Sequence, residues 1–295
     1  MSVPNTAPQI KYDIPADACD CHMHVFGELE RFPGTAGHSY TPRPAPVDDW
    51  KRAFMALGIQ RLVVVQPSCY GTDNRCLIET MIALDGRARG VVDIDSSISE
   101  RELMQLHDAG VRGVRINAKS VGARDPMVLS KRIAAIAGRI SPYGWHVQIY
   151  TELAVITAIA DALRDALCPI VLDHMGGAHV EQTAVDLQVL CALLREGNCW
   201  VKLSGAYRVS PQREGFTDTI QIARTLLDCN SERIVWGSDW PHTAEHAGRP
   251  QSKPSQIGFR DIDEKSLLSL LAEQCGDAAI FERVLVKNAA VLYQF

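Results

Sequence analysis

The chain has 295 residues, of which 46% are hydrophobic, and its formal net charge is −5. This composition suits one large globular core, and it lacks the strongly basic character typical of proteins that bind nucleic acid or membrane surfaces. The nine cysteines include no Cys-x-x-Cys motif, and no apolar stretch reaches the roughly 18 residues needed to span a bilayer. Because the first residues also lack a signal-peptide pattern, we expect a reduced, cytoplasmic protein without a nucleic-acid or membrane partner.

Short runs rich in Val and Ile alternate along the chain with longer amphipathic stretches. Buried parallel strands have this composition. The predicted strands are, in chain order, Ala18–Phe26, Arg61–Gln66, Gly90–Ile94, Gly113–Asn117, His146–Tyr150, Ile170–His174, Cys199–Ser204 and Ile234–Asp239. Helical spacing of apolar residues lies between them, and Ser99 followed by Glu102 is the capping-box pattern of a helix that begins at Glu100.

Eight strand–helix units in one chain of this length predict a single α/β domain over residues 1–295, a (β/α)8 TIM-like barrel. A doubly wound open sheet is the alternative. The segments Leu267–Cys275 and Asp277–Tyr293 predict two C-terminal helices that close the barrel. Two long loops, 40–46 and 242–258, follow the first and last strands, and both leave strand carboxyl ends, where barrel enzymes place their chemistry.

A pair of histidines stands at the exit of the first predicted strand. His22 and His24 are two residues apart, so their side chains are expected on the same face. Cys19 and Cys21 would then lie on the opposite face, which argues against cysteine ligands for a metal ion. Two imidazoles on one face of a strand exit indicate a functional site.

A third histidine and a carboxylate stand at two further strand exits. His174 ends the sixth predicted strand, and Asp239 ends the eighth. With the histidine pair they make a set that can polarise a carbonyl and activate water, which predicts a hydrolase with Asp239 as general base. A turn or helix N-cap is the alternative role for Asp239, because it precedes Trp240-Pro241.

The remaining strand exits carry polar and basic side chains that could bind a substrate. They are Ser68, Arg115, Lys119, Tyr150 and, shortly after the seventh strand, Arg208. Arginine binds planar anions in a bidentate manner, so this rim predicts an anionic substrate with one or more acid groups. The alternative is that each charge is a solvated loop residue.

The other histidines have weaker contexts. His146 begins its strand instead of ending it, so we expect a structural role at the opposite end of the barrel. His242 and His246 follow Asp239 on the loop and could line the site.

Four motifs resemble those of the amidohydrolase superfamily, in particular its amidohydrolase-2 type. They are Asp20-x-His22-x-His24, Asp173-His174-Met175-Gly176, Lys202-Leu203-Ser204-Gly205 and Trp236-Gly237-Ser238-Asp239-Trp240-Pro241-His242. The resemblance implies a distorted (β/α)8 barrel that hydrolyses a small anionic lactone. It further implies that Asp239 is the base, that His22, His24 and His174 polarise the lactone carbonyl, and that Arg115, Arg208, Tyr40, Tyr150 and Ser68 bind the acid groups, with Lys119 near a further basic position.

The resemblance also bears on metal content. Two-metal members need a bridging carboxylated lysine or a glutamate on a middle strand and a histidine at the fifth strand's exit. In this chain the fourth strand ends at Asn117 and the fifth at Tyr150. Tyrosine at that exit resembles the metal-independent lactonases, so no cofactor is expected. The alternative is one Zn²⁺ on His22, His24, His174 and Asp239, which suit that ion by type and number. The alternative activities are a sugar-acid lactonase, a lactone isomerase, a metal-dependent hydrolase or decarboxylase, and a non-catalytic sensor of an acidic metabolite.

Overall fold

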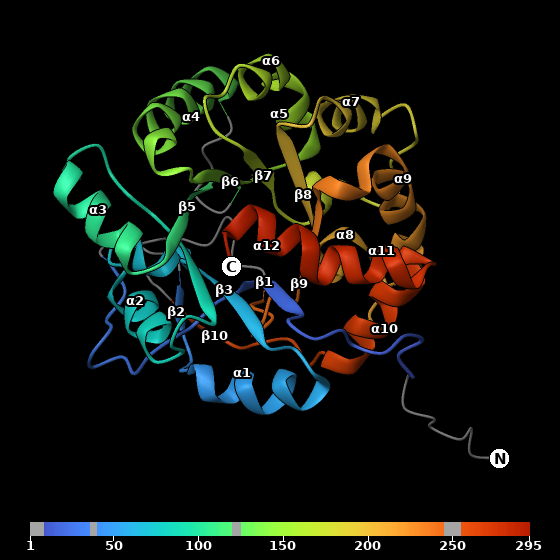
Figure 1. Cartoon of the computed structure of the whole chain (residues 1–295), viewed down its shortest axis with the longest axis horizontal. Helices are drawn as coiled ribbons and strands as arrows, with labels where there is room; N and C mark the ends of the chain where they lie inside the picture. The colour runs from blue at the N-terminus through green and yellow to red at the C-terminus, as the bar shows by residue number, and fades with distance from the viewer. Residues whose placement is uncertain (1–8, 36–39, 120–124, 245–254) are drawn as a thin grey trace.

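Eight parallel strands form a ring at the centre of the computed structural model, which describes residues 9–35, 40–119, 125–244 and 255–295 (Figure 1). Neighbouring strands pair in the order β1-β3-β4-β5-β6-β7-β8-β9. The strands are β1 Cys19–Met23, β3 Arg61–Val65, β4 Ala88–Val92, β5 Val111–Asn117, β6 His146–Tyr150, β7 Ile170–Leu172, β8 Cys199–Ser204 and β9 Ile234–Gly237. All eight predicted strands are present, which confirms the barrel.

Helices surround the ring of strands, and most of them join successive strands (Figure 1). They are α1 Val47–Phe54, α2 Arg75–Ile82, α3 Glu100–Asp108, α4 Pro126–Ile140, α5 Leu153–Ala158, α6 Ala160–Arg164, α7 Gln188–Glu196, α8 Ala206–Val209, α9 Ile220–Asn230, α10 Glu264–Cys275, α11 Ala278–Glu282 and α12 Asn288–Tyr293. The predicted capping box is present at the start of α3, where Ser99 and Glu102 bond each other's backbone N–H groups. The second predicted C-terminal helix is interrupted by a π-helical turn, Arg283–Lys287, between α11 and α12.

The ring closes between β1 and the residues that follow β9. The Asp239 amide donates to the His22 carbonyl oxygen at 2.8 Å, and the His24 amide donates to the Trp240 carbonyl oxygen at 2.8 Å. Met23 and Trp240 form a parallel bridge between these bonds. This closure seam rules out the open-sheet alternative, and it holds two of the predicted site histidines directly beside the predicted base.

A buried carboxylate, Asp20, reinforces the seam. Its Oδ1 accepts hydrogen bonds from the His22 and Ser238 amides, and its Oδ2 accepts from the Ser238 hydroxyl and, at 3.0 Å, from Trp50 Nε1 of α1. Each oxygen is therefore satisfied within the barrel wall, as a buried carboxylate requires. Asp20 ties β1, β9 and α1 together, a role that the sequence did not indicate.

The predicted placement of the cysteines is wrong, because β1 contains a bulge. Asp20 pairs with Leu62 and Met23 pairs with Val64, so β1 uses three residues where β3 uses two, and the pairing shifts by one residue. An extra residue in one strand places consecutive side chains on the same face. Cys19 and Cys21 accordingly pack inside the barrel with Val63, Val65 and Val235, below the histidines and not behind them.

Helix α12 covers the end of the barrel opposite the strand exits and lies in the foreground of Figure 1. Its Leu292 and Tyr293 pack into the apolar cluster inside the ring. The His146 ring lies across Tyr293 with centroids 5.3 Å apart, and burial lowers the pKa of His146 to about 3. The expected structural role of His146, at this end of the barrel, agrees with that position.

A short parallel pair joins the two long loops near the strand exits. Strand β2, Tyr40–Pro42, pairs with β10, Ser255–Ile257. Neither strand was predicted, since each has three residues and pairs with a segment more than two hundred residues away in sequence. Their pairing fixes Tyr40 beside the ring.

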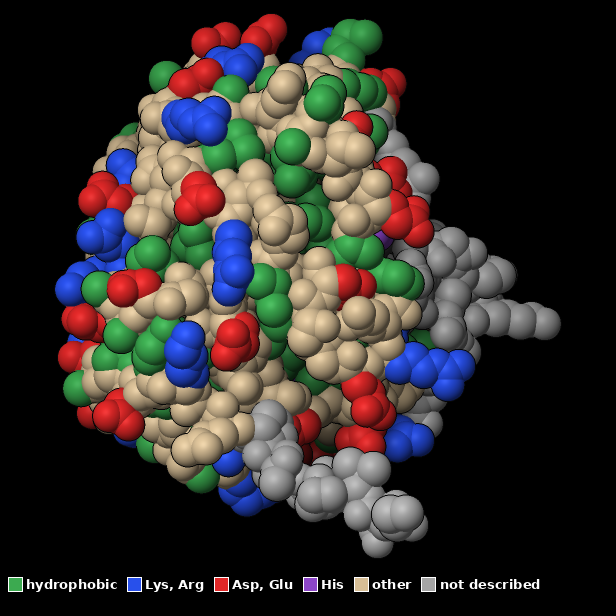
Figure 2. Space-filling view, turned by 90° about the vertical axis from the view of Figure 1, so that its right-hand side faces the viewer, with side chains coloured by type: hydrophobic (Ala, Val, Ile, Leu, Met, Phe, Trp, Pro, Cys, Tyr) green, Lys and Arg blue, Asp and Glu red, His purple; other side chains and the backbone are tan. Residues whose placement is uncertain are grey.

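The outer surface is mixed in charge. Acidic and basic side chains are interspersed over the face shown in Figure 2. Within the described part of the chain, no helix combines the length and apolar character needed to cross a bilayer.

Gly237 sits where the seam leaves no room for a side chain. A Cβ atom there would lie 2.4 Å from His22 Cβ and 2.7 Å from the His22 nitrogen. We expect Gly237→Ala to lower the free energy of unfolding by about 1–3 kcal/mol, the usual cost of overpacking a core. Urea denaturation measures this, with Gly138→Ala on the open face of α4 as the matched control, because a Cβ at Gly138 meets no atom within 4 Å. A Gly237→Ala protein as stable as the control would contradict the tight seam.

Candidate active site

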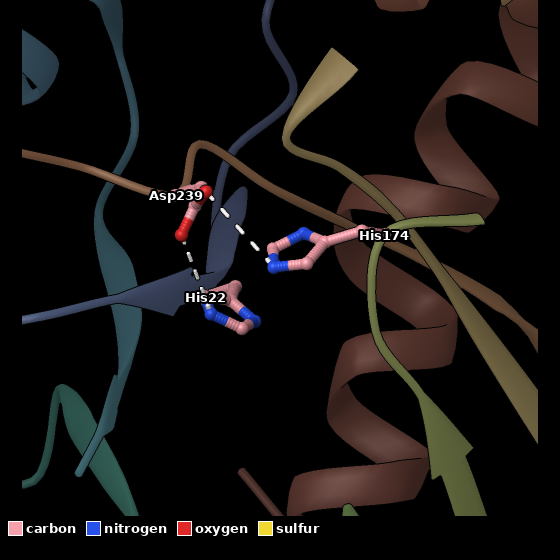
Figure 3. Close-up of side chains that lie close together, drawn as sticks. All are labelled: His22, His174 and Asp239. Atoms are coloured by element: carbon pink, nitrogen blue, oxygen red, sulfur yellow. Dashed lines mark ion pairs between the residues drawn. The ribbon is translucent and has the colours of Figure 1, made fainter. Parts of the chain in front are cut away.

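Three histidines and one aspartate from three strand exits converge inside the mouth of the barrel. Asp239 Oδ1 lies 3.6 Å from His22 Nε2 and 3.5 Å from His24 Nε2, and Asp239 Oδ2 lies 4.0 Å from His174 Nε2. Figure 3 shows His22 and His174 pointing toward the Asp239 carboxylate from different strands. All four predicted residues are buried, so the chain brings together the set that the sequence analysis singled out.

Left-handed backbone turns aim two of these side chains. His174 has φ 51° and Asp239 has φ 63°, and each follows a strand that ends two residues earlier. A left-handed residue costs roughly 1–2 kcal/mol and ends a strand, so both strands are shorter than predicted. The turn also breaks side-chain alternation. Asp173 and His174, adjacent in sequence, therefore both face the barrel interior.

Ser204 and Gly205 support the His174 ring. The Ser204 hydroxyl lies 3.0 Å from His174 Nδ1. Gly205 has φ 54°, and a Cβ there would lie 2.7 Å from the same nitrogen. The glycine is needed both for its left-handed backbone and for the close approach of the imidazole.

The two oxygens of Asp239 have different surroundings. Oδ2 accepts from the Tyr207 hydroxyl at 2.7 Å and from Arg208 Nε at 2.6 Å. Oδ1 has no hydrogen-bond partner among the described residues. Burial alone would raise the pKa of Asp239, but the Arg208 guanidinium holds the pKa well below its usual value. Asp239 is therefore ionised, with Oδ1 as its free oxygen.

Hydrogen bonds on the far side of each ring decide which imidazole nitrogen carries a proton. His24 Nδ1 lies 2.8 Å from the Val65 carbonyl oxygen, which can only accept. His22 Nδ1 lies 3.2 Å from Asp173 Oδ1, a carboxylate oxygen. Burial lowers the pKa of both histidines, so both are neutral. His24 then holds its proton on Nδ1 and directs its Nε2 lone pair toward Asp239. At His22 Nδ1 the Asp173 oxygen is the closer contact, and Lys202 Nζ, which can only donate, lies at 3.5 Å.

His174 is the exception among the three imidazoles. Its Nδ1 faces the Ser204 hydroxyl, which can donate as well as accept. Burial lowers the pKa of His174 to about 4. A hydrogen bond donated by Ser204 would place the proton of the neutral ring on Nε2, from where it can be donated into the site.

The two arginines predicted to bind substrate lie on either side of the carboxylates. Arg115 donates from Nη1 to the Gln66 carbonyl oxygen at 3.0 Å, and its Nε lies 3.8 Å from Asp173 Oδ2. Arg208 bonds Asp239 and donates from Nη2 to the Thr243 carbonyl oxygen at 3.1 Å. Both guanidinium groups are thus inside the mouth of the barrel and not at its solvated rim.

The other predicted binding residues surround this centre in two groups. The Tyr150 ring lies across His174 with centroids 4.7 Å apart, and Lys119 Nζ lies 5.6 Å from the Tyr150 ring centroid. On another side, the buried Tyr40 hydroxyl shares a hydrogen bond with Ser68.

The predicted loop histidines contribute less. His242 Nε2 lies 2.9 Å from a Glu264 carboxylate oxygen, and the His242 ring packs behind Tyr207 with centroids 5.8 Å apart. It supports Tyr207 and does not contact the Asp239 carboxylate. His246 lies outside the described residues.

Three residues of the site had no predicted role. The Tyr207 hydroxyl donates to Asp239, Asp173 Oδ1 lies 3.2 Å from His22 Nδ1, and Lys202 Nζ lies 3.5 Å from the same nitrogen. Lys202 carries the clearest signal in the sequence, because a charged residue in the middle of the apolar strand Cys199–Ser204 needs a buried partner. Tyr207 had no such signal in the sequence, because its position in the site depends on the short helix α8.

The same atoms meet the requirements for binding one metal ion. Ligand atoms of His22, His174 and Asp239 lie within 4.8 Å of one another. His22 Nε2 and Asp239 Oδ1 are buried and lack hydrogen-bond partners in the described structure. A carboxylate on the other nitrogen of a histidine is also typical of metal-ligating histidines. The residues therefore fit a divalent cation such as Zn²⁺.

Comparisons with known proteins identify a family and several relatives. A family model described as Amidohydrolase matches residues 19–295. A 2-pyrone-4,6-dicarboxylate hydrolase of Comamonas testosteroni is 34% identical over 299 residues, covering 97% of this chain and 92% of the relative. A 4-sulfomuconolactone hydrolase of Hydrogenophaga intermedia is 28% identical, covering 96% of this chain and 91% of the relative.

A solved structure has the same fold. The apo crystal structure of an Agrobacterium tumefaciens protein is similar with a TM-score of 0.78 and 26% identity, covering 97% of this chain and 99% of that one. The family match spans the whole ring of strands and every residue of the site. The chain belongs to the amidohydrolase family.

Proposed function

We propose that the protein hydrolyses a small lactone that carries one or more acid groups, with Asp239 as the general base. The candidate substrates are 2-pyrone-4,6-dicarboxylate and similar muconolactones. The observation that carries the proposal is the asymmetry of Asp239. Its Oδ2 is held by Tyr207 and Arg208, while its Oδ1 is buried, ionised and free to accept a proton.

The acceptors around Oδ1 suit an attacking water molecule. A water can donate one proton to Asp239 Oδ1 and the other to Nε2 of His22 or His24, both of which lie within 3.6 Å of that oxygen. Its lone pair is then available to the carbonyl carbon. As the oxygen attacks, Asp239 takes the proton. The C–O bond of the lactone ring then breaks, and Asp239 returns this proton to the leaving oxygen.

With these protonation states, only one of the three histidines can polarise the carbonyl. Polarising a carbonyl requires an N–H donor, and His22 and His24 present lone pairs at Nε2. We assign the donor role to His174, whose Nδ1 faces Ser204. A donor aimed at a developing oxyanion contributes about 10²–10³-fold in rate, and a lactone is more reactive than an amide.

The cationic side chains support an anionic substrate. Arg115 and Arg208 lie beside Asp173 and Asp239, and a third cation, Lys202, lies below them. The two relatives are named for substrates that carry carboxylate or sulfonate groups. We assign the acid groups of the substrate to Arg115 and Arg208, with Tyr40, Ser68, Tyr150 and Lys119 around them.

A metal-dependent hydrolase or decarboxylase is the second candidate, which the fit of the site to a cation favours. Bound by His22, His24, His174 and Asp239, a Zn²⁺ would polarise the carbonyl and lower the pKa of a bound water. The lactone reaction assigned above needs only the side chains themselves, so we expect no cofactor requirement.

A substrate panel tests the proposal. Ring opening is measured for 2-pyrone-4,6-dicarboxylate, 4-sulfomuconolactone and unsubstituted 2-pyrone, a matched ring without charges. Because a charge-assisted hydrogen bond is worth about 1.5–3 kcal/mol, we expect kcat/KM for the dicarboxylate to exceed that for 2-pyrone by at least about 100-fold. Binding without turnover across the panel would contradict catalysis and favour a sensor.

A chelator arm in the same assay tests the cofactor. We expect turnover to survive removal of metal ions. Activity that is lost on chelation and restored by Zn²⁺ would favour the metal-dependent candidate.

A further inference from the structure

A lysine is fully buried inside the barrel, directly below the candidate active site. Lys202 lies on β8, and its Nζ donates to the Cys21 carbonyl oxygen at 2.8 Å and to Gln148 Oε1 at 2.6 Å. Burial lowers the pKa of Lys202 to about 8. A buried ammonium group is costly unless it is paired, so its partner indicates why the lysine is present.

The partner is Asp173, which is also fully buried. Its Oδ1 lies 3.8 Å from Lys202 Nζ, and its Oδ2 accepts from Gln148 Nε2 at 3.1 Å. Gln148 therefore bridges the two charges, with its carbonyl oxygen on the lysine and its amide on the carboxylate. Two cations flank the carboxylate, Lys202 Nζ at 3.8 Å from Oδ1 and Arg115 Nε at 3.8 Å from Oδ2, and nearby positive charges favour its ionised form.

The His22 imidazole lies between the Asp173 carboxylate and the candidate active site. Asp173 Oδ1 lies 3.2 Å from His22 Nδ1, and on the opposite side His22 Nε2 lies 3.6 Å from Asp239 Oδ1. An ionised carboxylate can only accept, and it lies closer to Nδ1 than Lys202 Nζ, which can only donate and stands 3.5 Å away, so the shorter contact favours the imidazole proton on Nδ1. The lone pair of Nε2 is thereby directed at the place where the water must donate.

We propose that Lys202 and Asp173 are a buried positioning pair that holds His22 with its proton on Nδ1 and its lone pair directed toward Asp239. The lysine and Gln148 hold the carboxylate in place, and the carboxylate sets the tautomer and orientation of the ring. Neither residue touches the substrate. The catalytic consequence of the pair rests on the proposed function, but the tautomer itself does not.

The tautomer is measured directly by ¹⁵N NMR of chelator-treated protein labelled at its histidines. Two-bond ¹H–¹⁵N correlations distinguish a protonated Nδ1 from a protonated Nε2, and the His22→Asn spectrum identifies the His22 signals. In the wild-type protein we expect His22 to be protonated at Nδ1. A wild-type His22 protonated at Nε2 would overturn the proposal without any variant and without any substrate.

Variants test each member of the pair. An asparagine amide can donate to Nδ1, so we expect Asp173→Asn to move the His22 proton to Nε2. Asp20→Asn is the matched control, a buried aspartate on β1 that bonds no imidazole ring, and it should leave the His22 tautomer unchanged. An unchanged tautomer in Asp173→Asn, or the same change in the control, would overturn the proposal.

The lysine has its own readout. In Lys202→Met we expect kcat on the best lactone of the panel to fall by about 10–100-fold, as for other residues that orient a functional histidine, with KM little changed. A kcat within twofold of wild type would remove Lys202 from the pair. If the panel yields no substrate, the NMR result still decides the tautomer, so failure of the lactonase proposal and failure of this one are distinguishable.

Discussion

Asp239→Asn is expected to lower kcat for lactone hydrolysis by about 10²–10⁴-fold, the usual contribution of a general base. The asparagine keeps the size of the side chain, but it cannot take a proton from water at the Oδ1 position. The Tyr207 hydroxyl and the Arg208 guanidinium would still find an oxygen to bond. Steady-state kinetics on the best lactone of the panel measure the change, and circular dichroism confirms that the variant is folded.

The matched control for this variant is Glu196→Gln. Glu196 accepts two bonds from Arg164 Nε on the outside of the barrel, at 3.1 and 2.9 Å, so the pair resembles Asp239 and Arg208 in chemistry but not in place. We expect its kcat to remain within twofold of wild type. Turnover by Asp239→Asn equal to that of the control would remove Asp239 from the base role.

Arg208→Met is expected to change both substrate affinity and pH dependence. Loss of a charge-assisted hydrogen bond worth about 1.5–3 kcal/mol should raise KM for the dicarboxylate by roughly 10–100-fold. Arg208 also opposes the effect of burial on Asp239, so its removal lets burial raise the pKa of that carboxyl. A base acts only when ionised, so activity is present above its pKa and lost as the pH falls through it.

The pH profile separates these two effects. The wild-type pKa of Asp239 lies well below its usual value, so Asp239 should produce no acid limb in kcat/KM above about pH 4. In Arg208→Met an acid limb should appear at higher pH. Arg164→Met on the outer surface is the control and should move neither KM nor the profile. A variant with raised KM and an unchanged profile would mean that Arg208 binds substrate without tuning the base.

The sequence predicted the ring of strands because each strand is a Val- and Ile-rich run, a signal that is local. The four central residues were also predicted, since a histidine or aspartate at a strand exit is visible without knowing the fold. The direction of the cysteine side chains was not, because one extra residue in β1 places Cys21 inside the barrel with His22. The left-handed turns at His174 and Asp239 left no comparable signal, because both residue types are common in ordinary loops.

The network below the site depends on contacts between distant parts of the chain. Lys202 donates to a carbonyl oxygen 181 residues away, and Gln148 and Asp173 come from two further strands. Only the closed ring brings these groups together. A lysine within an apolar strand could indicate that a partner exists, but nothing local to Lys202 identifies which carboxylate it is.

The closure seam has a consequence for how the molecule can move. The two amides that complete the ring belong to Asp239 and His24, and the carbonyl groups that accept them belong to His22 and Trp240. The hydrogen bonds that join β1 to the segment after β9 are thus made by the backbone of the site residues. Any fluctuation that separates these two segments also moves Asp239 away from His22 and His24.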